Sequence, residues 1–158
     1  MFDPTPASAT APTVARVVSL VRSIPLSVDL GRYELAEAAF APRVRIDYSS
    51  LWGGQAQDMA AADLLAAWRG LVPGFDATLH ELGPVQVSLN GDSAQATADV
   101  VASHWLEGQL WRLVGRYEWP LRRGTDGWRV TGMTFQCLQE QGDRGLCERA
   151  QARVAARV

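Results

Sequence analysis

Two histidines, His80 and His104, are the side chains of this sequence best suited to carry protons near neutral pH. In an apolar pocket an imidazole can remove a proton next to a carbonyl group, and a tyrosine hydroxyl or a second imidazole can polarise that carbonyl. A single histidine on an apolar face is more often a hydrogen-bonded core residue than a catalyst. The role of His104, which lies in the apolar stretch DVVASHWL, therefore has to be judged from the elements that position it.

A predicted hairpin determines which way His104 points. If Glu107-Gly108 forms a two-residue turn, His104 lies opposite Trp111, and small residues meet large ones along the same face. The other face then carries Asp99 opposite Arg116, together with further arginines. A slip by one residue would bury these arginines, so the register is strongly specified. The pattern predicts that one set of residues points to the covered side of the sheet: His104, Trp111, Tyr117 and Trp119.

Three further polar residues are candidates for the same side. RVRIDY alternates cleanly and places Tyr48 on the covered face of its strand. Asp29 ends the first predicted helix beside an apolar stripe, a poor position for a purely solvated carboxylate. For His80, strict alternation along the strand would bury Glu81 instead, whereas a bulge at Gly83-Pro84 would bury His80. Burying Glu81 is the more expensive choice, so the bulge is favoured.

The elements around these residues predict an α+β domain. Helices are expected over 13–28, bent or interrupted at Pro25 and ended near Gly31, then over 33–40 and, after Asp58 as a cap, over 59–71. Strands are expected over 43–48, 77–82, 84–90, 93–106, 109–123 and 128–138, and the tail from Gly145 reads as an amphipathic helix. This order predicts helices on one face of an antiparallel sheet. Residues 1–10 are expected to form a flexible segment and residues 11–158 a single domain.

Composition excludes several classes of partner. The 158 residues carry a formal net charge of −2, so neither nucleic acid nor an anionic membrane is expected to bind. The chain lacks a membrane-length apolar run and a secretory signal, so a cytoplasmic location is predicted. All 15 basic residues are arginine, which indicates a GC-rich, bacterial genome. The two histidines lack a nearby His or Cys partner, and no cofactor motif is present, so neither a metal nor a cofactor is expected.

The order of these motifs resembles the nuclear transport factor 2-like superfamily, and within it the SnoaL-like relatives of polyketide cyclases, closest to scytalone dehydratase-like proteins. The most specific match is APRVRIDYSS, with LSVD before it, ATLH and ASH after it, and the hairpin GRYEWPLRRGTDGW towards the end. The resemblance implies a curved sheet wrapped against helices to form a cone with a deep apolar pocket. It also implies that Asp29, Tyr48, His80 and His104 carry the site, with His104 paired to Asp29 and a water held by Tyr48 and His80.

The sequence departs from those relatives where they bind substrate. A second tyrosine of the dehydratase site is replaced by Val28, and the serine and asparagine of its penultimate strand have no counterpart in YEWPL. Scytalone itself is therefore not the expected substrate. The residues predicted to contact the ligand are Val28, Trp52 in the rim loop SSLWGGQ, Trp111, Tyr117 and Trp119.

The leading functional prediction is a cofactor-free lyase or isomerase, dehydratase- or cyclase-like, acting on a small hydrophobic carbonyl compound. The alternative is a non-catalytic small-molecule binding protein of the same fold, and a third reading is a structural module with a filled core. A homo-oligomer is expected because Val101, Trp105 and Val114 interrupt the polar face of the sheet, although a dimer and a trimer remain open.

Overall fold

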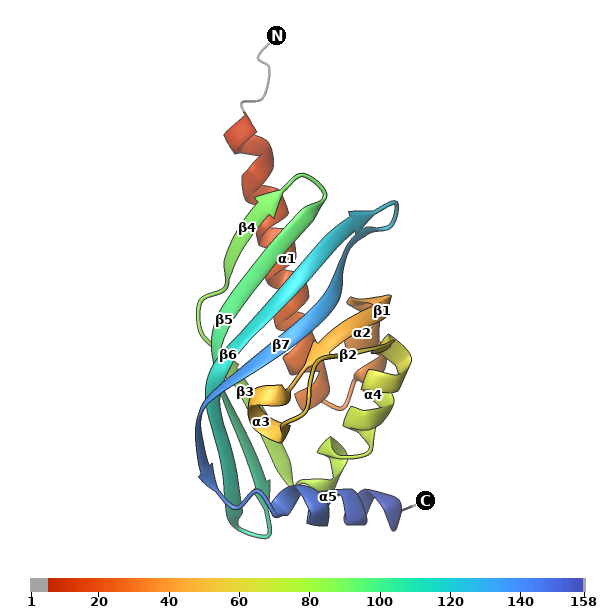
Figure 1. Ribbon diagram of the computed structural model, residues 1–158, viewed down its shortest axis with the longest axis vertical. Coiled ribbons are helices and arrows are strands. Elements are labelled where there is room, and N and C mark those ends of the chain that lie inside the picture. The colour runs from red at the N-terminus through yellow and green to blue at the C-terminus, as the bar shows by residue number, and fades with distance from the viewer. Residues whose placement is uncertain (1–5, 158) are drawn as a thin grey trace.

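The computed structural model describes residues 6–157, which form helices packed against one curved sheet (Figure 1). In chain order the elements are α1 (Pro6–Asp29), α2 (Tyr33–Ala38), β1 (Phe40–Asp47), α3 (Ser49–Trp52), β2 (Gln57–Ala60), α4 (Ala61–Arg69), the 3₁₀ turn η1 (Val72–Gly74), β3 (Ala77–Leu82), β4 (Gln86–Asn90), β5 (Ser93–Leu106), β6 (Gln109–Gly124), β7 (Gly127–Gly142) and α5 (Leu146–Ala155). The predicted α+β class is confirmed. Residues 6–10 are helical, whereas the rest of the segment expected to be flexible lies outside the described residues.

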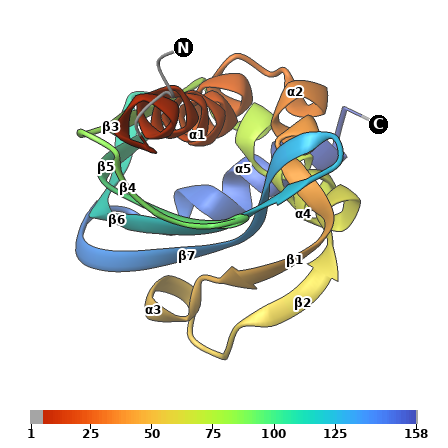
Figure 2. The same cartoon turned by 90° about the horizontal axis from the view of Figure 1, so that it is seen from above.

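The sheet has the strand order β2-β1-β7-β6-β5-β3. Strand β4 also pairs with β5, over a part of β5 that does not pair with β3. Its pairings are antiparallel except for β1 with β7, which run parallel. The prediction of an antiparallel sheet is therefore wrong at this pair, because β1 follows a helix and joins the sheet beside its last strand. Register shifts in the pairing of β6 with β7 bend the sheet, which curves around α1 when viewed from above (Figure 2).

The β5–β6 hairpin has the predicted register along its whole length. His104 pairs with Trp111, Ala98 with Tyr117 and Ala96 with Trp119. The turn is made by Glu107 and Gly108, both with positive φ (51° and 76°), as a two-residue turn that follows the twist of the strands requires. Burial alternates along both strands, so the predicted assignment of faces is confirmed.

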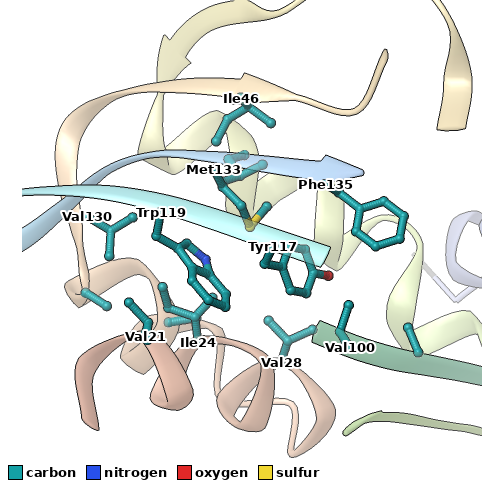
Figure 3. Packing of buried hydrophobic residues seen from close by; sticks show 14 of the residues in the cluster. Val21, Ile24, Val28, Ile46, Val100, Tyr117, Trp119, Val130, Met133 and Phe135 are labelled. Atoms are coloured by element: carbon teal, nitrogen blue, oxygen red, sulfur yellow. The ribbon is translucent and has the colours of Figure 1, made fainter. Parts of the chain in front are cut away.

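Helix α1 lies in the concave face of the sheet and buries Val21, Ile24 and Val28 against it (Figure 3). Val17 of the same helix is also buried. A bend or an interruption was predicted at Pro25, and the interruption does not occur, since the helix continues through this residue to Asp29. A proline removes one backbone hydrogen bond, but the buried face supplies most of the stability of such a helix. Gly31, with φ +71°, follows the end of the helix as predicted.

Two short elements occupy the predicted loop after Tyr48 and the first residues of the helix predicted over 59–71, which begins at Ala61 instead. These are α3 and β2, and β2 pairs with β1 as an edge strand. Asp58 therefore does not cap the following helix, as predicted, but lies in β2 and forms an ion pair with Arg45. Strand β7 also extends past the predicted end at Leu138, and α5 closes that end of the sheet, packed against η1 (Figure 1).

Candidate active site inside the cone

A cavity of about 410 Å³ lies between α1, α4 and the concave face of the sheet. This volume lies within the range typical of small-molecule sites, roughly 300–1,000 Å³. Most of its wall is aliphatic or aromatic, and its two histidines lie where β3 and β5 run side by side. The other polar lining residues come from other elements, namely Tyr48, Ser49, Gln55, Gln57, Tyr117 and Gln151. Among the predicted site residues, eight line the cavity: Val28, Tyr48, Trp52, His80, His104, Trp111, Tyr117 and Trp119.

Asp29, the last residue of α1, is held by three hydrogen bonds from β3. Its Oδ1 accepts from Thr78 Oγ1 at 2.9 Å and lies 2.8 Å from His80 Nδ1, and its Oδ2 accepts from the His80 backbone N–H at 2.7 Å. Burial acts to raise the pKa of Asp29, but the hydrogen bonds and charge of His80, helped by Thr78, outweigh it and hold the pKa below its usual 3.8. Asp29 is therefore ionised at neutral pH and lies directly behind His80.

The partner of Asp29 differs from the one implied by the resemblance, which was His104. The reason is the position of β3 at the edge of the sheet, beside the end of α1. An edge strand leaves backbone N–H groups without a partner strand, and Asp29 accepts the one from His80. This brings the carboxylate within reach of the His80 ring. His104 lies on the inner strand β5, opposite Thr78, and hydrogen-bonds elsewhere.

The contact with Asp29 determines the tautomer of neutral His80. An ionised carboxylate only accepts hydrogen bonds, so Nδ1 of His80 carries the hydrogen and Nε2 keeps a lone pair. The side chain is 13% exposed, and the residue lines the cavity. The predicted bulge is also borne out by the burial pattern of β3, in which Thr78, His80 and Leu82 are the partly buried residues and Glu81 is exposed. His80 is thus a positioned imidazole with a carboxylate behind it.

His104 occupies a different environment a short distance away. Its Nδ1 lies 3.1 Å from the Trp111 carbonyl oxygen, and its ring packs between Phe75 and Trp111 at centroid distances of 5.1 and 4.6 Å. Burial, followed by the charge of His80, lowers the pKa of His104 to about 4, so the ring is neutral at pH 7. Because a carbonyl only accepts, Nδ1 carries the hydrogen and Nε2 is an acceptor. The two imidazoles meet edge to face at 5.8 Å.

Tyr48 and Tyr117 provide the hydroxyl groups of the cavity. Tyr48 follows β1 directly, and Tyr117 comes from β6. Their aromatic rings both pack against Phe135, at centroid distances of 6.3 and 5.3 Å. Burial raises the pKa of each hydroxyl well above its ordinary value of 10. Both are therefore protonated at neutral pH and can donate a hydrogen bond.

Trp52 lies at the rim of the cavity and is 49% exposed. Its ring lies 5.8 Å from that of Trp111, and the Arg144 guanidinium lies over it at 5.0 Å. Glu140 joins the two partners, since it accepts from the Trp111 indole at 2.8 Å and forms an ion pair with Arg144 at 2.8 Å. Two glycines with positive φ, Gly53 and Gly54, follow Trp52. These contacts fix a tryptophan beside two glycines at the entrance of the cavity.

Sequence reasoning missed several residues that shape the site. Thr78 lies two positions before His80 on the same face, a spacing that could have identified it as a second partner for the carboxylate. Glu140 lies beyond the predicted end of its strand, and Phe75 precedes the predicted start of another. Within residues 6–157, no three His, Cys, Asp or Glu side chains cluster closely enough to hold a metal ion. None of the described helices is both long and apolar enough to cross a membrane.

The α+β fold with an internal cavity is shared with a solved nuclear transport factor 2-like protein of Novosphingobium aromaticivorans that has a cystatin-like fold, 19% identical with a TM-score of 0.69. The profile of the SnoaL-like domain family matches residues 9–134, and the chain belongs to this family. The comparison with curated proteins finds no match.

Solved structures of similar fold come from several bacteria. The Kfla4162 protein of Kribbella flavida is 25% identical with a TM-score of 0.80, covering 90% of this chain and 99% of its own. A scytalone dehydratase-like protein of Novosphingobium aromaticivorans is 12% identical with a TM-score of 0.73, covering 87% and 92%. A hexachlorocyclohexane dehydrochlorinase of Novosphingobium barchaimii is 13% identical with a TM-score of 0.70, covering 86% and 93%. The last two likenesses show a common fold.

Proposed function

We propose that this protein is a cofactor-free acid–base lyase or isomerase that acts on a small, hydrophobic carbonyl compound. The observation that carries the proposal is the hydrogen-bonded pair of Asp29 and His80 at the wall of an apolar cavity. A carboxylate behind an imidazole stabilises the imidazolium that forms when the ring takes up a proton. The pair therefore has the arrangement of a general base facing a bound molecule.

The proposed reaction begins with His80. Its Nε2 removes a proton from the carbon next to the substrate carbonyl, and the electron pair of the broken C–H bond forms an enolate. Tyr48 or Tyr117, whose hydroxyls stay protonated, donates a hydrogen bond to the enolate oxygen. If a β-hydroxyl is present, it leaves with the proton from the His80 imidazolium as water, and the electron pair forms the new C=C bond. In a substrate that instead carries a β,γ-double bond, the enolate is conjugated with it, and return of the proton from the His80 imidazolium to the γ-carbon moves the double bond and completes an isomerisation.

His104 takes a binding role in this scheme. It is neutral at pH 7, and its Nε2 can only accept, so it suits a hydroxyl group of the substrate rather than a carbonyl oxygen. A hydroxyl held there lies near His80, since the two rings are 5.8 Å apart. The names of two proteins of the same fold, a scytalone dehydratase-like protein and a dehydrochlorinase, both denote eliminations, which supports the same class of reaction here.

The test is proton exchange and elimination by wild type and a matched variant. We would incubate the protein with 1-tetralone in D₂O and with a panel of β-hydroxy aryl ketones, and measure deuterium uptake by NMR and enone formation by absorbance. In the His80→Asn variant, the amide nitrogen can replace Nδ1 as the donor to Asp29 while the base is lost. Loss of about 10²–10⁴-fold in rate is expected. Wild type without exchange or elimination would favour the alternative of a non-catalytic binding protein. A variant as active as wild type would mean that His80 is not the base.

We further propose that the protein is a homo-oligomer and cytoplasmic. The support for assembly is that Val101, Trp105 and Val114 are only partly buried on the outer face of the sheet. Light scattering coupled to size-exclusion chromatography tests the oligomer, and a monomeric mass would reject it.

A further inference from the structure

Trp119 carries a buried hydrogen-bond donor without a partner. Among the side chains that the structure describes, its indole Nε1 is the one buried nitrogen or oxygen with no hydrogen-bond partner. The residue is fully buried, whereas the indole nitrogen of Trp111, on the same strand, donates to Glu140. Buried polar groups are nearly always paired in folded proteins, so an exception calls for an explanation in terms of what the site binds.

The walls around this donor offer it no acceptor. Trp119 lines the cavity together with Ile24, Ile46 and Met133, whose side chains are hydrocarbon or thioether (Figure 3). Tyr117 packs against the indole at a centroid distance of 5.2 Å, but no hydrogen bond joins the two side chains. A trapped water would need two or more polar partners, and the side chains of Ile24, Ile46 and Met133 supply none. A bound molecule is therefore the available source of an acceptor.

Trp119 lies further along the cavity than the histidines, as the strand pairing shows. His80 pairs with Ala102, and Ala102 pairs with Leu113 on β6. Trp119 comes six residues after Leu113, which corresponds to at most about 20 Å along an extended strand. Strand β6 thus runs the length of the cavity and contributes Trp111 near one end and Trp119 near the other.

We propose that the indole N–H of Trp119 donates to an oxygen of the bound molecule at the end remote from the reacting carbon. The cavity then takes an elongated, largely apolar molecule with a carbonyl or comparable acceptor oxygen at that end. The assignment of the reacting end rests on the proposed function, whereas the donor at Trp119 does not. Because the nitrogen is buried, the ligand reaches it through a small shift of the wall, of which the flexible Met133 forms part.

The direct test is NMR of wild-type protein labelled with ¹⁵N at the tryptophan indoles. The probes are 2-acetylnaphthalene and its isostere 2-isopropenylnaphthalene, which lacks the oxygen. The Trp119 signal is assigned by its absence in Trp119→Phe. We expect its indole proton to shift downfield as the ketone saturates the protein and to show no such shift with the hydrocarbon. A Trp119 signal that stays in place at saturation, or no saturable response to the ketone, would overturn the proposal.

Affinities of the two probes provide the second measurement. Trp119→Phe should weaken binding of the ketone by about three- to tenfold, as expected for one hydrogen bond, and change binding of the hydrocarbon by less than about twofold. Trp128→Phe is the matched control, since Trp128 is a buried tryptophan outside this cavity and should leave both affinities unchanged. Equal losses for both probes would mean that Trp119 is only part of the wall. Neither measurement uses turnover. The proposal about Trp119 can therefore be confirmed or rejected independently of the proposed reaction.

Discussion

The buried, neutral state of His104 makes a quantitative prediction about stability against pH. Its pKa is about 4 in the folded protein and 6.5 in the reference state, because burial and the neighbouring His80 disfavour the charged ring. Between these values the unfolded chain binds more protons than the folded one, so the free energy of unfolding rises with pH. The contribution is complete above about pH 6.5 and is lost as the pH falls to about 4. The difference of 6.5 − 4 = 2.5 units corresponds to about 3 kcal/mol.

His104→Asn isolates this contribution. The asparagine amide can still donate to the Trp111 carbonyl, as Nδ1 does in wild type, but it does not titrate. We would measure chemical unfolding of both proteins at several values between pH 4 and pH 7.5 and subtract the two curves. Other acidic groups, Asp29 included, titrate in both proteins and cancel in the difference.

The expected difference falls by about 3 kcal/mol from the upper to the lower end of this range, with a slope of about 1.4 kcal/mol per pH unit in its middle. Parallel curves for wild type and variant would refute the reasoning, because they would mean that His104 is protonated equally in the folded and unfolded chain. In the protonated ring both nitrogens donate and neither accepts, so the role of His104 as an acceptor for a substrate hydroxyl would have to be given up.

Three further predictions concern other contacts. Asp29→Asn should lower kcat/KM for the proposed reaction by about 10²-fold and lower the free energy of unfolding by about 2 kcal/mol, because a buried carboxylate with three donors is replaced by an amide. Steady-state kinetics and denaturant titration measure the two effects. Unchanged kinetics would contradict the assignment of Asp29 and His80 as the general base. Glu140→Gln removes the ion pair with Arg144, so it should weaken the contact of the Arg144 guanidinium with the Trp52 ring and speed ligand dissociation in stopped-flow fluorescence. Asp99→Asn removes an ion pair on the outer face of the sheet and should leave the dissociation rate unchanged. Gly74→Ala should weaken the packing of α5, because a Cβ at residue 74 would lie 1.9 Å from a backbone oxygen of that helix. Faster hydrogen exchange of the α5 amides would show this, and unchanged exchange would contradict the prediction.

The parts of the fold that could be predicted are those governed by local pattern. The register of the β5–β6 hairpin followed from one turn and from small residues facing large ones, and the bulge after β3 followed from the cost of burying Glu81. The parallel pairing of β1 with β7 could not be derived in this way, because it joins segments far apart in the chain. Short elements such as α3 and β2 have too few residues to show a period.

The same distinction explains the candidate site. Alternation identified which residues face the cavity, and both histidines were placed there correctly. The choice of partner for Asp29 depends on which strand forms the sheet edge beside the end of α1, and this is a property of the assembled sheet. Sequence pattern therefore located the polar groups but did not determine how they pair.

The charges of the assembled site also restrict what it can bind. The chain contains no lysine, and no arginine lines the cavity among the described residues. His104 is neutral, the tyrosine hydroxyls keep their protons, and the ionised Asp29 is already satisfied by three donors from β3. A carboxylate or phosphate on the ligand would have to leave water without a full counter-charge, which is costly in an apolar cavity. The site is therefore suited to uncharged molecules, in which the polar groups are hydroxyl and carbonyl oxygens and the remaining surface is hydrocarbon.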